Sequence, residues 1–233
     1  MADGEGKGAL IVGAGSGLSA SLARQMAAKG YRVGLAARGV EKLQPLADEI
    51  GAASFACDAS DPGSVEAMFV AADAGLGDID AVFFNASARA RGPFVDLDPA
   101  EVKRAIEITA FGGFLVAQAA VRRMLPRGHG AILFTGASAS VKGYPRSAPF
   151  AMGKFALRGL AQSLARELAP ENIHVAHFVI DGGIRAEARP EPTDNPDSML
   201  DPEAIARTYL HVLEQDRSAW TWEVELRPWV ERF

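Results

Sequence analysis

The stretch "GALIVGAGSGLSASLARQMAAKG" (8–30) decides the fold. It begins with the short apolar run "GALIVGA" (8–14), which is typical of a strand that is buried on both faces. The segment "LSASLARQMAAKG" (18–30) has helical periodicity, and Gly30 is suited to close the helix. A buried strand, a glycine-rich turn and a helix follow one another within these residues. The order predicts the first unit of an α/β fold.

Similar units follow along the chain, because short apolar runs alternate with longer segments of helical period. Further strands are expected at residues 31–37, 53–58, 79–86, 130–137 and 173–180 and in the C-terminal segment 220–226, and the main helices at about 40–50, from 62, at 99–125 and at 148–169. This alternation predicts an α/β chain in which helices cover both faces of a parallel sheet. We therefore expect a single doubly wound, Rossmann-type domain over residues 1–233.

One irregular, proline-rich segment interrupts this pattern at about 184–203. It follows the last long strand, at the edge where such folds bind ligands. Two interpretations are equally open from the sequence: a lid that closes over a bound substrate, or a plain surface connection.

Composition and charge exclude several classes of function. The 233 residues carry a net charge of -5, and no run of lysine or arginine provides a basic field, so we expect no nucleic-acid partner. The single cysteine permits no disulfide within the chain. No wholly apolar stretch reaches the roughly 18 residues of a membrane span, and the N-terminus does not resemble a secretion signal. We expect a cytoplasmic protein without a membrane partner, and the four histidines indicate no metal site.

The glycine-rich turn between the first strand and the first helix is the first candidate binding site. Gly13, Gly15 and Gly17 allow the backbone to approach a diphosphate closely, while Ser16 and Leu18 complete the turn and begin the helix. The spacing differs from the strict G-x-G-x-x-G pattern, and a glycine turn by itself is a weak signal. Its position after the first strand favours a dinucleotide cofactor over a merely tight turn.

The end of the second strand indicates which dinucleotide is preferred. Here "LAARG" (35–39) has no carboxylate that could accept hydrogen bonds from the ribose hydroxyls of NAD. Arg38 is suited instead to pair with a 2′-phosphate, which favours NADP. The alternative is that Arg38 is an ordinary surface arginine.

Several motifs in order along the chain resemble those of the short-chain dehydrogenase/reductase family. The motifs are "VGAGSGLS" (12–19), "ACDASD" (56–61), "FNASA" (84–88), "PFAMGK" (149–154) and "IDGGI" (180–184). The resemblance implies a nicotinamide dinucleotide cofactor. It assigns cofactor contacts to Asp58 with the adjoining Ala59 on the adenine side, to Asn85 and to the backbone at Ile184, and it assigns Lys154 to the ribose of the nicotinamide.

The catalytic residues that the resemblance implies are mostly replaced. The family uses an asparagine, a serine, a tyrosine and a lysine, and the matching positions here hold Thr109, Ala137, Phe150 and Lys154. Phenylalanine has no exchangeable proton, so Phe150 cannot act as the acid or base. Losing a positioned acid typically lowers the rate by about 10²–10⁴-fold.

Three substitutes for the missing acid are open. Ser138 adjoins the vacant serine position, and Tyr144 lies in the loop that borders the substrate pocket in the family. Alternatively, the substrate needs no protein acid, or it uses a water held by Thr109. With Lys154, we take Ser138 and Tyr144 as the candidate catalytic residues.

Two functions are compatible with these residues. The first is an NADP-dependent oxidoreductase that acts on a small organic substrate with an altered proton donor. The second is a non-catalytic dinucleotide-binding protein with a sensing or partner-binding role. The alanine-rich helices at 99–125 and 148–169 resemble those that pair subunits in the family, so we expect a homo-oligomer, either a dimer or a tetramer.

Overall fold

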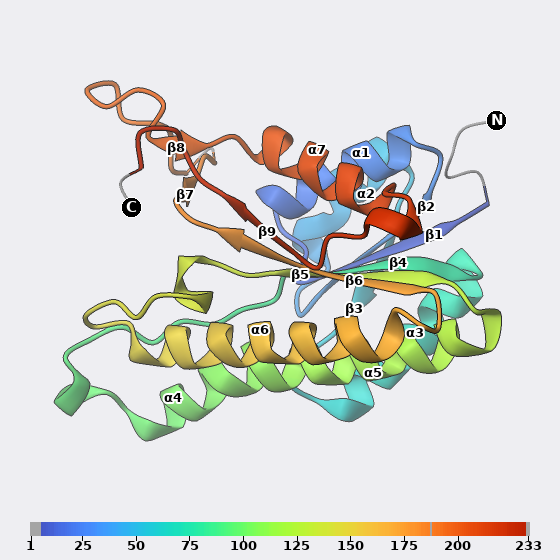
Figure 1. Ribbon diagram of the computed structural model, residues 1–233, viewed down its shortest axis with the longest axis horizontal. Helices are drawn as coiled ribbons and strands as arrows, with labels where there is room; N and C mark the ends of the chain where they lie inside the picture. Colours follow the sequence, from blue (N-terminus) through green and yellow to red (C-terminus); the bar gives the residue numbers. More distant parts are fainter. Residues whose placement is uncertain (1–5, 187, 232–233) are drawn as a thin grey trace.

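The structure, a computed structural model, describes residues 6–186 and 188–231 and contains a seven-stranded sheet (Figure 1). All neighbouring strands run parallel, in the order β3-β2-β1-β4-β5-β6-β9. Their bounds are β1 Gly8–Val12, β2 Arg32–Ala37, β3 Ala53–Ala56, β4 Ile79–Phe84, β5 Gly130–Thr135, β6 Ile173–Ile180 and β9 Glu223–Leu226. The predicted doubly wound parallel sheet is confirmed, and its order reverses between β1 and β4.

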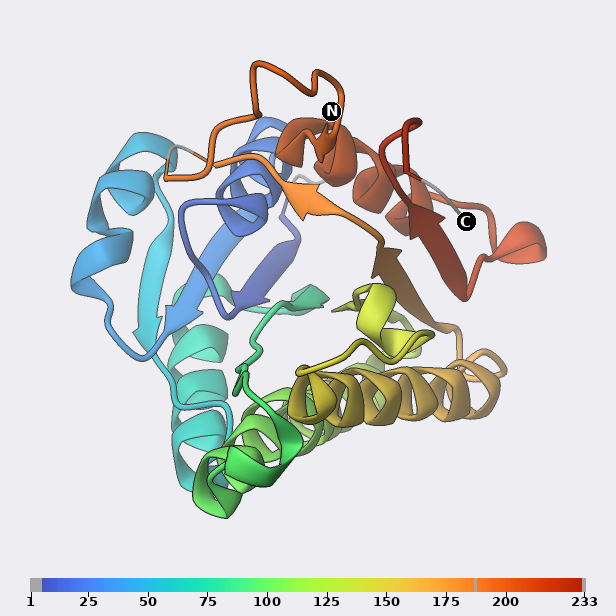
Figure 2. The same cartoon turned by 90° about the vertical axis from the view of Figure 1, so that its left-hand side faces the viewer.

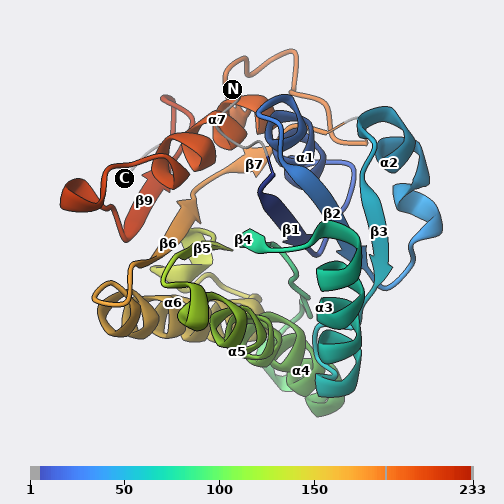
Figure 3. The same ribbon diagram turned by 90° about the vertical axis from the view of Figure 1, so that its right-hand side faces the viewer.

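Helices cover both faces of the sheet, as the view in Figure 3 shows. On one face lie α1 (Leu18–Ala28), α2 (Gln44–Ile50) and α7 (Pro202–Leu213), and on the other lie α3 (Pro62–Leu76), α4 (Pro99–Ile106), α5 (Gly112–Met124) and α6 (Ala148–Leu168). Short 3₁₀ turns are η1 (Glu41–Leu43), η2 (Phe94–Asp96), η4 (Leu125–Arg127), η5 (Ser138–Ser140) and η6 (Arg217–Ala219).

Each face of the sheet carries a hydrophobic core, and successive side chains of a strand point alternately into one core and the other. In β1, Ile11 belongs to the core under α1, α2 and α7, whereas its neighbours Leu10 and Val12 belong to the core under α3, α5 and α6. Successive residues of a strand point to opposite faces, so a strand that is apolar throughout can bury both. The continuous apolar runs in the sequence are explained by this two-sided burial.

The helix expected at 99–125 is present but is not regular. It begins after Asp98, whose side chain caps Ala100 N at 2.9 Å, and a π-helical segment at Glu107–Phe111 separates α4 from α5. The run Pro99–Arg127 has the length of a membrane span and contains an 18-residue window with a mean hydropathy of 1.3, which corrects the expectation that no apolar stretch reaches that length. Half of its apolar window is buried inside the molecule, a property that the core helix of a globular protein shares.

Helix starts explain two further differences from the sequence prediction. The helix expected at 40–50 divides into the 3₁₀ turn η1 and α2, and Pro45 stands in the first turn of α2, where its missing N–H costs nothing. Helix α7 was not predicted as an element. It begins with the same device as α3: an aspartate, here Asp201, accepts from the backbone N–H of Glu203 and precedes a proline.

The segment proposed as a lid contains the short parallel pair β7 (Gly183–Ile184) and β8 (Met199–Leu200). Figure 1 shows this pair and the loop between its strands beyond the carboxyl end of β6. Residue 187 of the segment lies outside the described residues. Whether the segment closes over a ligand stays a prediction.

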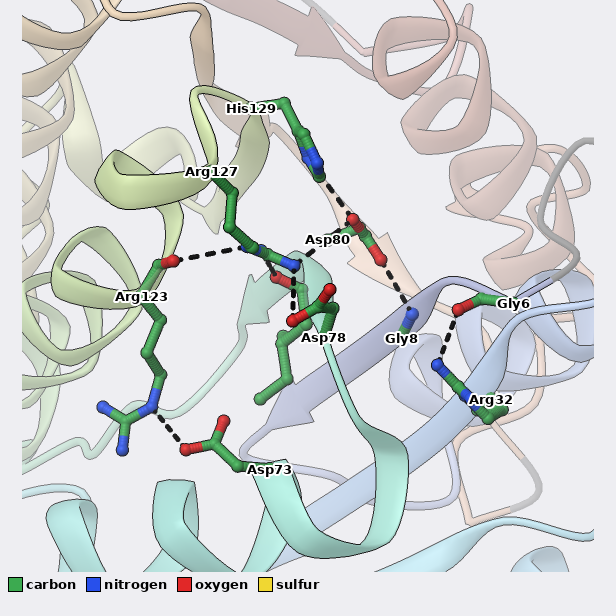
Figure 4. Close-up of polar contacts among 10 residues, drawn as sticks. Gly6, Gly8, Arg32, Asp73, Asp78, Asp80, Arg123, Arg127 and His129 are labelled. Carbon is green, nitrogen blue, oxygen red and sulfur yellow. Dashed lines mark hydrogen bonds and ion pairs between the residues drawn. The ribbon is translucent and has the colours of Figure 1, made fainter.

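The amino ends of the strands are joined by paired charges (Figure 4). Asp80 accepts a hydrogen bond from Gly8 N at 3.0 Å, which ties β4 to β1. Arg127 lies 3.4 Å from Asp78 and 3.6 Å from Asp80, and it donates to the carbonyl of Ile79 at 2.5 Å. One arginine thus serves two carboxylates and a strand carbonyl.

Candidate active site

Two cavities lie at the carboxyl ends of the strands, the edge that faces the viewer in Figure 2. The larger has a volume of about 820 Å³ and the smaller about 230 Å³. Asn85 and Ser87, directly after β4, line both. The two cavities therefore meet at the point where the strand order reverses, which is where doubly wound folds bind ligands.

The glycine turn after β1 borders the smaller cavity, and its glycines have different physical reasons. Gly13 has a φ of +84°, and a Cβ there would lie 2.3 Å from Ala86 N, so close packing requires this glycine. At Gly15 and Gly17 a Cβ would meet nothing within 4 Å. The turn is thus open where a diphosphate would lie, and α1 begins beside it without a side-chain cap.

The burial and contacts of the other turn residues are compatible with a cofactor-binding turn. Ser16 is exposed at the tip, and Leu18 is the buried first residue of α1. Ser19, which departs from the family pattern, is 1% exposed and donates to Gly13 O at 3.3 Å. It also accepts from Asn85 Nδ2 at 2.6 Å, so it fixes the turn to the end of β4.

The smaller cavity holds the residues predicted for the adenosine side of a cofactor. Its walls include Arg38, Asp58 and Ala59. The Asp58 carboxylate accepts from the backbone and hydroxyl of Ser60, at 3.0 and 2.6 Å, and these hydrogen bonds keep the pKa of Asp58 low. The positive charges of Arg38 and Arg104 lower this pKa further. Asp58 is therefore an ionised acceptor with a basic neighbour at the end of β2.

Lys154 is fully enclosed at the junction of α6 and β5. It is 3% exposed, lines the larger cavity, and donates from Nζ to the carbonyl of Thr135 at 2.6 Å. Burial, and then the positive charge of Arg89, lower the pKa of Lys154 to about 7. The lysine is thus an ammonium donor whose charge is readily lost near neutral pH.

Phe150 and Arg89 form the wall beside Lys154. Phe150 is 6% exposed, so it is a core aromatic and a cavity residue at once. The Arg89 guanidinium lies 4.0 Å from the centre of the Phe150 ring, and Lys154 Nζ lies 5.8 Å from it. Cations close to an aromatic face are attracted by its quadrupole. Sequence reasoning missed Arg89, although it stands only four residues after Asn85.

The structure brings together both candidate substitutes for the missing acid. Ser138 and Tyr144 line the same cavity as Lys154 and Phe150, and Tyr144 is 44% exposed. Ala137 also lines it, between β5 and the 3₁₀ turn at Ser138–Ser140.

Thr109, the third candidate, has a different position. It is 1% exposed, and its hydroxyl accepts from the backbone N–H of Ala88 at 3.2 Å. It also packs against α6, because a Cβ on Gly153 would lie 3.0 Å from its own Cβ. Thr109 lines neither of the two cavities, and the alternative of a water held by Thr109 stays a prediction. Its hydroxyl is used to fix the loop after β4.

Ile184, assigned to the nicotinamide amide, lies on the wall of the larger cavity at the end of β7. Its carbonyl accepts from Nε and Nη2 of Arg189, at 3.1 and 2.6 Å. The carbonyl of Ile184 thus has a donor from the same chain. A cofactor contact at this position would use another backbone group or displace Arg189.

A buried polar chain supports the floor of the site. His177, with no exposed surface, contacts Glu223 at 3.0 Å and Ser140 at 3.3 Å through its two ring nitrogens. Burial lowers the pKa of His177 to about 4 against the raising effect of Glu223, so the ring is neutral at pH 7. Glu223 is held in turn by Arg158, with two contacts of 2.7 Å. The chain ties β6, β9 and α6 to the turn after β5.

This geometry is accompanied by clear similarity to known proteins. The family described as short chain dehydrogenase matches residues 7–195. The chain belongs to this family. It is 31% identical over 176 residues to D-threitol dehydrogenase of Mycolicibacterium smegmatis, covering 73% of this chain and 68% of that protein. It is 35% identical over 191 residues to (+)-borneol dehydrogenase 1 of Salvia officinalis, covering 78% and 73%.

Solved structures agree over nearly the whole chain. A short-chain dehydrogenase from Rhodopseudomonas palustris has a TM-score of 0.83 at 36% identity and covers 97% of this chain and 100% of its own. A metagenomic short-chain oxidoreductase in complex with NADP has a TM-score of 0.85 at 28% identity, covering 97% and 98%. Short-chain dehydrogenases bind a nicotinamide dinucleotide, and the open glycine turn with its two joined cavities fits such a group.

Proposed function

We propose that this short-chain dehydrogenase is an NADP-dependent oxidoreductase that acts on a small organic substrate without the family's tyrosine. The observation that carries the proposal is the meeting of two cavities at Asn85, one bearing Arg38 and the other Lys154. When bound, the nicotinamide dinucleotide supplies or accepts the hydride. The protein's contribution is to bind, orient and manage a proton.

The cofactor-binding residues have separate tasks in this proposal. The amides around Gly15 and Gly17 receive the diphosphate, and Arg38 pairs with the 2′-phosphate. Asp58, with Ala59 beside it, accepts from the adenine. Lys154 Nζ, which donates to Thr135 O, has donors left for the ribose hydroxyls of the nicotinamide half. Asn85 holds the turn through Ser19 and orders the site indirectly.

The proton would come from the wall of the larger cavity. Phe150 has no proton to give, whereas the hydroxyls of Ser138 and Tyr144 and the ammonium of Lys154 lie on the same wall. With a pKa of about 7, Lys154 exchanges a proton near neutral pH at little cost. The three groups are therefore the catalytic candidates of the proposal.

Cofactor preference is the first test. Calorimetric titration of NADPH and NADH into the purified protein is expected to give tighter binding of NADPH. Equal affinity for the two, or tighter binding of NADH, would contradict the proposed preference for NADP. It would also contradict the assignment of Arg38 to the 2′-phosphate.

Turnover is the second test, and it separates the enzyme from the alternative. NADPH oxidation is followed with a panel of ketones, imines and enones, and then repeated with Ser138→Ala and Tyr144→Phe. Loss of the essential acid is expected to lower kcat by about 10²–10⁴-fold. Ser163→Ala, an exposed serine on α6, is the matched control. Tight NADPH binding without turnover on any compound would favour the non-catalytic, dinucleotide-binding role.

The proposal also covers the cellular location, the partners and the oligomeric state of the protein. We place it in the cytoplasm, acting without nucleic acid or membrane, as a dimer or tetramer. Exposed apolar side chains support self-association: Phe111 and Phe114 stack at 6.1 Å on the helical run Pro99–Arg127, and Met152 and Phe155 are half exposed on α6. Light scattering at micromolar concentration tests the oligomer, and a strictly monomeric protein would contradict it.

A further inference from the structure

Basic side chains gather around the larger cavity although the chain as a whole is acidic. Of the residues that the structure describes, four arginines and one lysine line it against two carboxylates, while the net charge of the protein is -5. The basic residues are Arg89, Arg91, Arg146, Lys154 and Arg189, and the carboxylates are Asp181 and Glu231. The arginines come from three segments: the loop after β4, the loop before α6 and the segment after β7. The fold therefore assembles a local positive field that no run of sequence contains.

Three of these arginines have no carboxylate partner within the part of the chain that is described. Neither an ion pair nor a side-chain hydrogen bond joins Arg89, Arg91 or Arg146 to residues 6–186 or 188–231. Arg158 on α6, by contrast, makes two contacts of 2.7 Å with Glu223. Arg91 and Arg146 are exposed residues of the cavity wall, so their guanidinium donors are available to a ligand that enters the cavity.

Arg89 has the most defined position of the three. Its guanidinium lies 4.0 Å from the centre of the Phe150 ring and faces the cavity beside Lys154. Arg89 is an exposed residue, although its guanidinium is partly enclosed. This burial, and the positive charges of Arg91 and Arg189, lower the pKa of Arg89. Like charges held together in this way repel one another, and a bound anion would relieve that repulsion.

The two carboxylates do not neutralise this field. Asp181 is 3% exposed and accepts from Lys142 Nζ at 2.9 Å, so its charge is already matched. Glu231 is exposed near the C-terminal end of the described chain. Among the described residues, no carboxylate other than these two lines the cavity that Arg89 and Arg146 share.

From this arrangement we infer that the substrate of the larger cavity is an anion, carrying a carboxylate or phosphate that Arg89 binds together with Arg91 and Arg146. The planar guanidinium matches both anions through two parallel hydrogen bonds. The inference rests on the proposed function and names the substrate class of that site. It is separate from the 2′-phosphate of the cofactor, because Arg38 lies at the smaller cavity, and no residue of the glycine turn lines the larger one.

The binding of small anionic probes tests the inference without turnover. Benzoate, phenyl phosphate and the neutral benzamide are titrated by calorimetry, at constant ionic strength, into protein saturated with NADP. At least one anion is expected to bind about tenfold or more tightly than benzamide, the usual worth of a charge-assisted pair. The ratio of benzoate to phenyl phosphate tells which anion the site prefers.

Variants locate the site. Arg89→Gln and Arg146→Gln are each expected to weaken binding of the preferred anion about tenfold and to leave benzamide unchanged. Arg207→Gln, an exposed arginine on α7 away from the cavity, is the matched control and keeps full affinity. Anion binding no tighter than benzamide binding, or unchanged anion binding in both cavity variants, would overturn the inference.

Failure of the inference is distinguishable from failure of the proposed function. NADP titration and NADPH turnover test the oxidoreductase, whereas the probes test the arginines and can be repeated on protein without cofactor. A protein that binds anions but no dinucleotide would keep the anion site and lose the proposed function. A protein that reduces neutral ketones but does not bind the anionic probes would keep the proposed function and lose the anion site.

Discussion

The two edges of the sheet use arginine in opposite ways. At the amino edge, Arg127 lies between Asp78 and Asp80 and also donates to Ile79 O (Figure 4). At the carboxyl edge, Arg89 and Arg146 line a cavity without an ion-pair partner among the described residues. The same side chain is therefore satisfied by the fold at one edge and left for a ligand at the other.

The difference separates arginines that stabilise the fold from arginines that are available to bind a ligand. A partly buried arginine that holds two carboxylates is costly to remove, because the acids lose their partner. Unpaired arginines that crowd one another do not stabilise the fold, and proteins keep such arrangements where function needs them. Variants of the amino edge should then change the free energy of unfolding, and variants of the carboxyl edge should change binding.

The largest effect on stability is expected from Arg127→Met at the amino edge. The arginine and Asp80 are only 17% and 14% exposed, so the change leaves a carboxylate and the Ile79 carbonyl poorly satisfied. The free energy of unfolding should fall by about 3 kcal/mol, at the lower end of the cost of breaking a buried pair. Urea denaturation measures it.

Cofactor affinity of the folded Arg127→Met protein should equal that of the wild type. Met124→Leu, a conservative change in the core beside this edge, controls for altered packing. If Arg127→Met weakened NADP binding as much as it weakened the fold, the two edges would not be separable.

The next effect concerns Lys154 and depends on pH. Its pKa is lowered to about 7 in the fold, whereas the unfolded chain binds the proton up to about 10.5. Between these values the unfolded state binds more protons, so stability rises with pH, and below pH 7 the full cost of the buried charge is present. From pH 7 to 9 the wild type should gain about 2 kcal/mol relative to Lys154→Met.

The measurement is chemical denaturation of both proteins across that range. The difference between the two proteins matters, because groups with other shifted pKa values, such as Cys57, titrate equally in both. A constant difference from pH 7 to 9 would mean that Lys154 keeps its ordinary pKa in the fold.

The sequence predicted the central sheet well and the loops poorly, for a physical reason. Strands such as Gly8–Val12 are apolar on both faces, and this pattern needs no knowledge of their partners. Helix α7 was overlooked, although Asp201 and a following proline mark its start. The π-helical segment at Glu107–Phe111 was also missed, because it arises where helices and the loop after β4 pack together.

Within the site, motif spacing predicted residues that belong to one segment of the chain. It did not predict residues that the fold brings together from several segments. Lys154 and the glycine turn were predicted from their own motifs, and both lie on cavities. Arg89 and Arg146 are 57 residues apart, and their lack of partners is a tertiary property that charge counting cannot reveal. The contact of the Thr109 hydroxyl with Ala88 N is likewise a tertiary property that spacing does not reveal.

A smaller effect is expected from Arg38→Ala at the carboxyl edge. This exposed arginine belongs to the smaller cavity, so the fold should keep its stability while NADP loses a charge-assisted contact. NADP affinity should fall about tenfold, with NAD affinity unchanged. Equal losses for both dinucleotides would show that Arg38 acts on the shape of the cavity and not on the 2′-phosphate.

The smallest effect should come from Arg123→Gln, again at the amino edge. Arg123 pairs with Glu66 at 3.0 Å and Asp73 at 2.8 Å, but these carboxylates are 54% and 44% exposed. Water can replace the arginine at both acids, so the free energy of unfolding should fall by only about 0.5–1 kcal/mol, and by less at high salt. A loss as large as that of Arg127→Met would mean that pairing by itself stabilises this edge. A small loss would assign the stability to burial of the paired charges, which is the property that the unpaired arginines of the cavity lack.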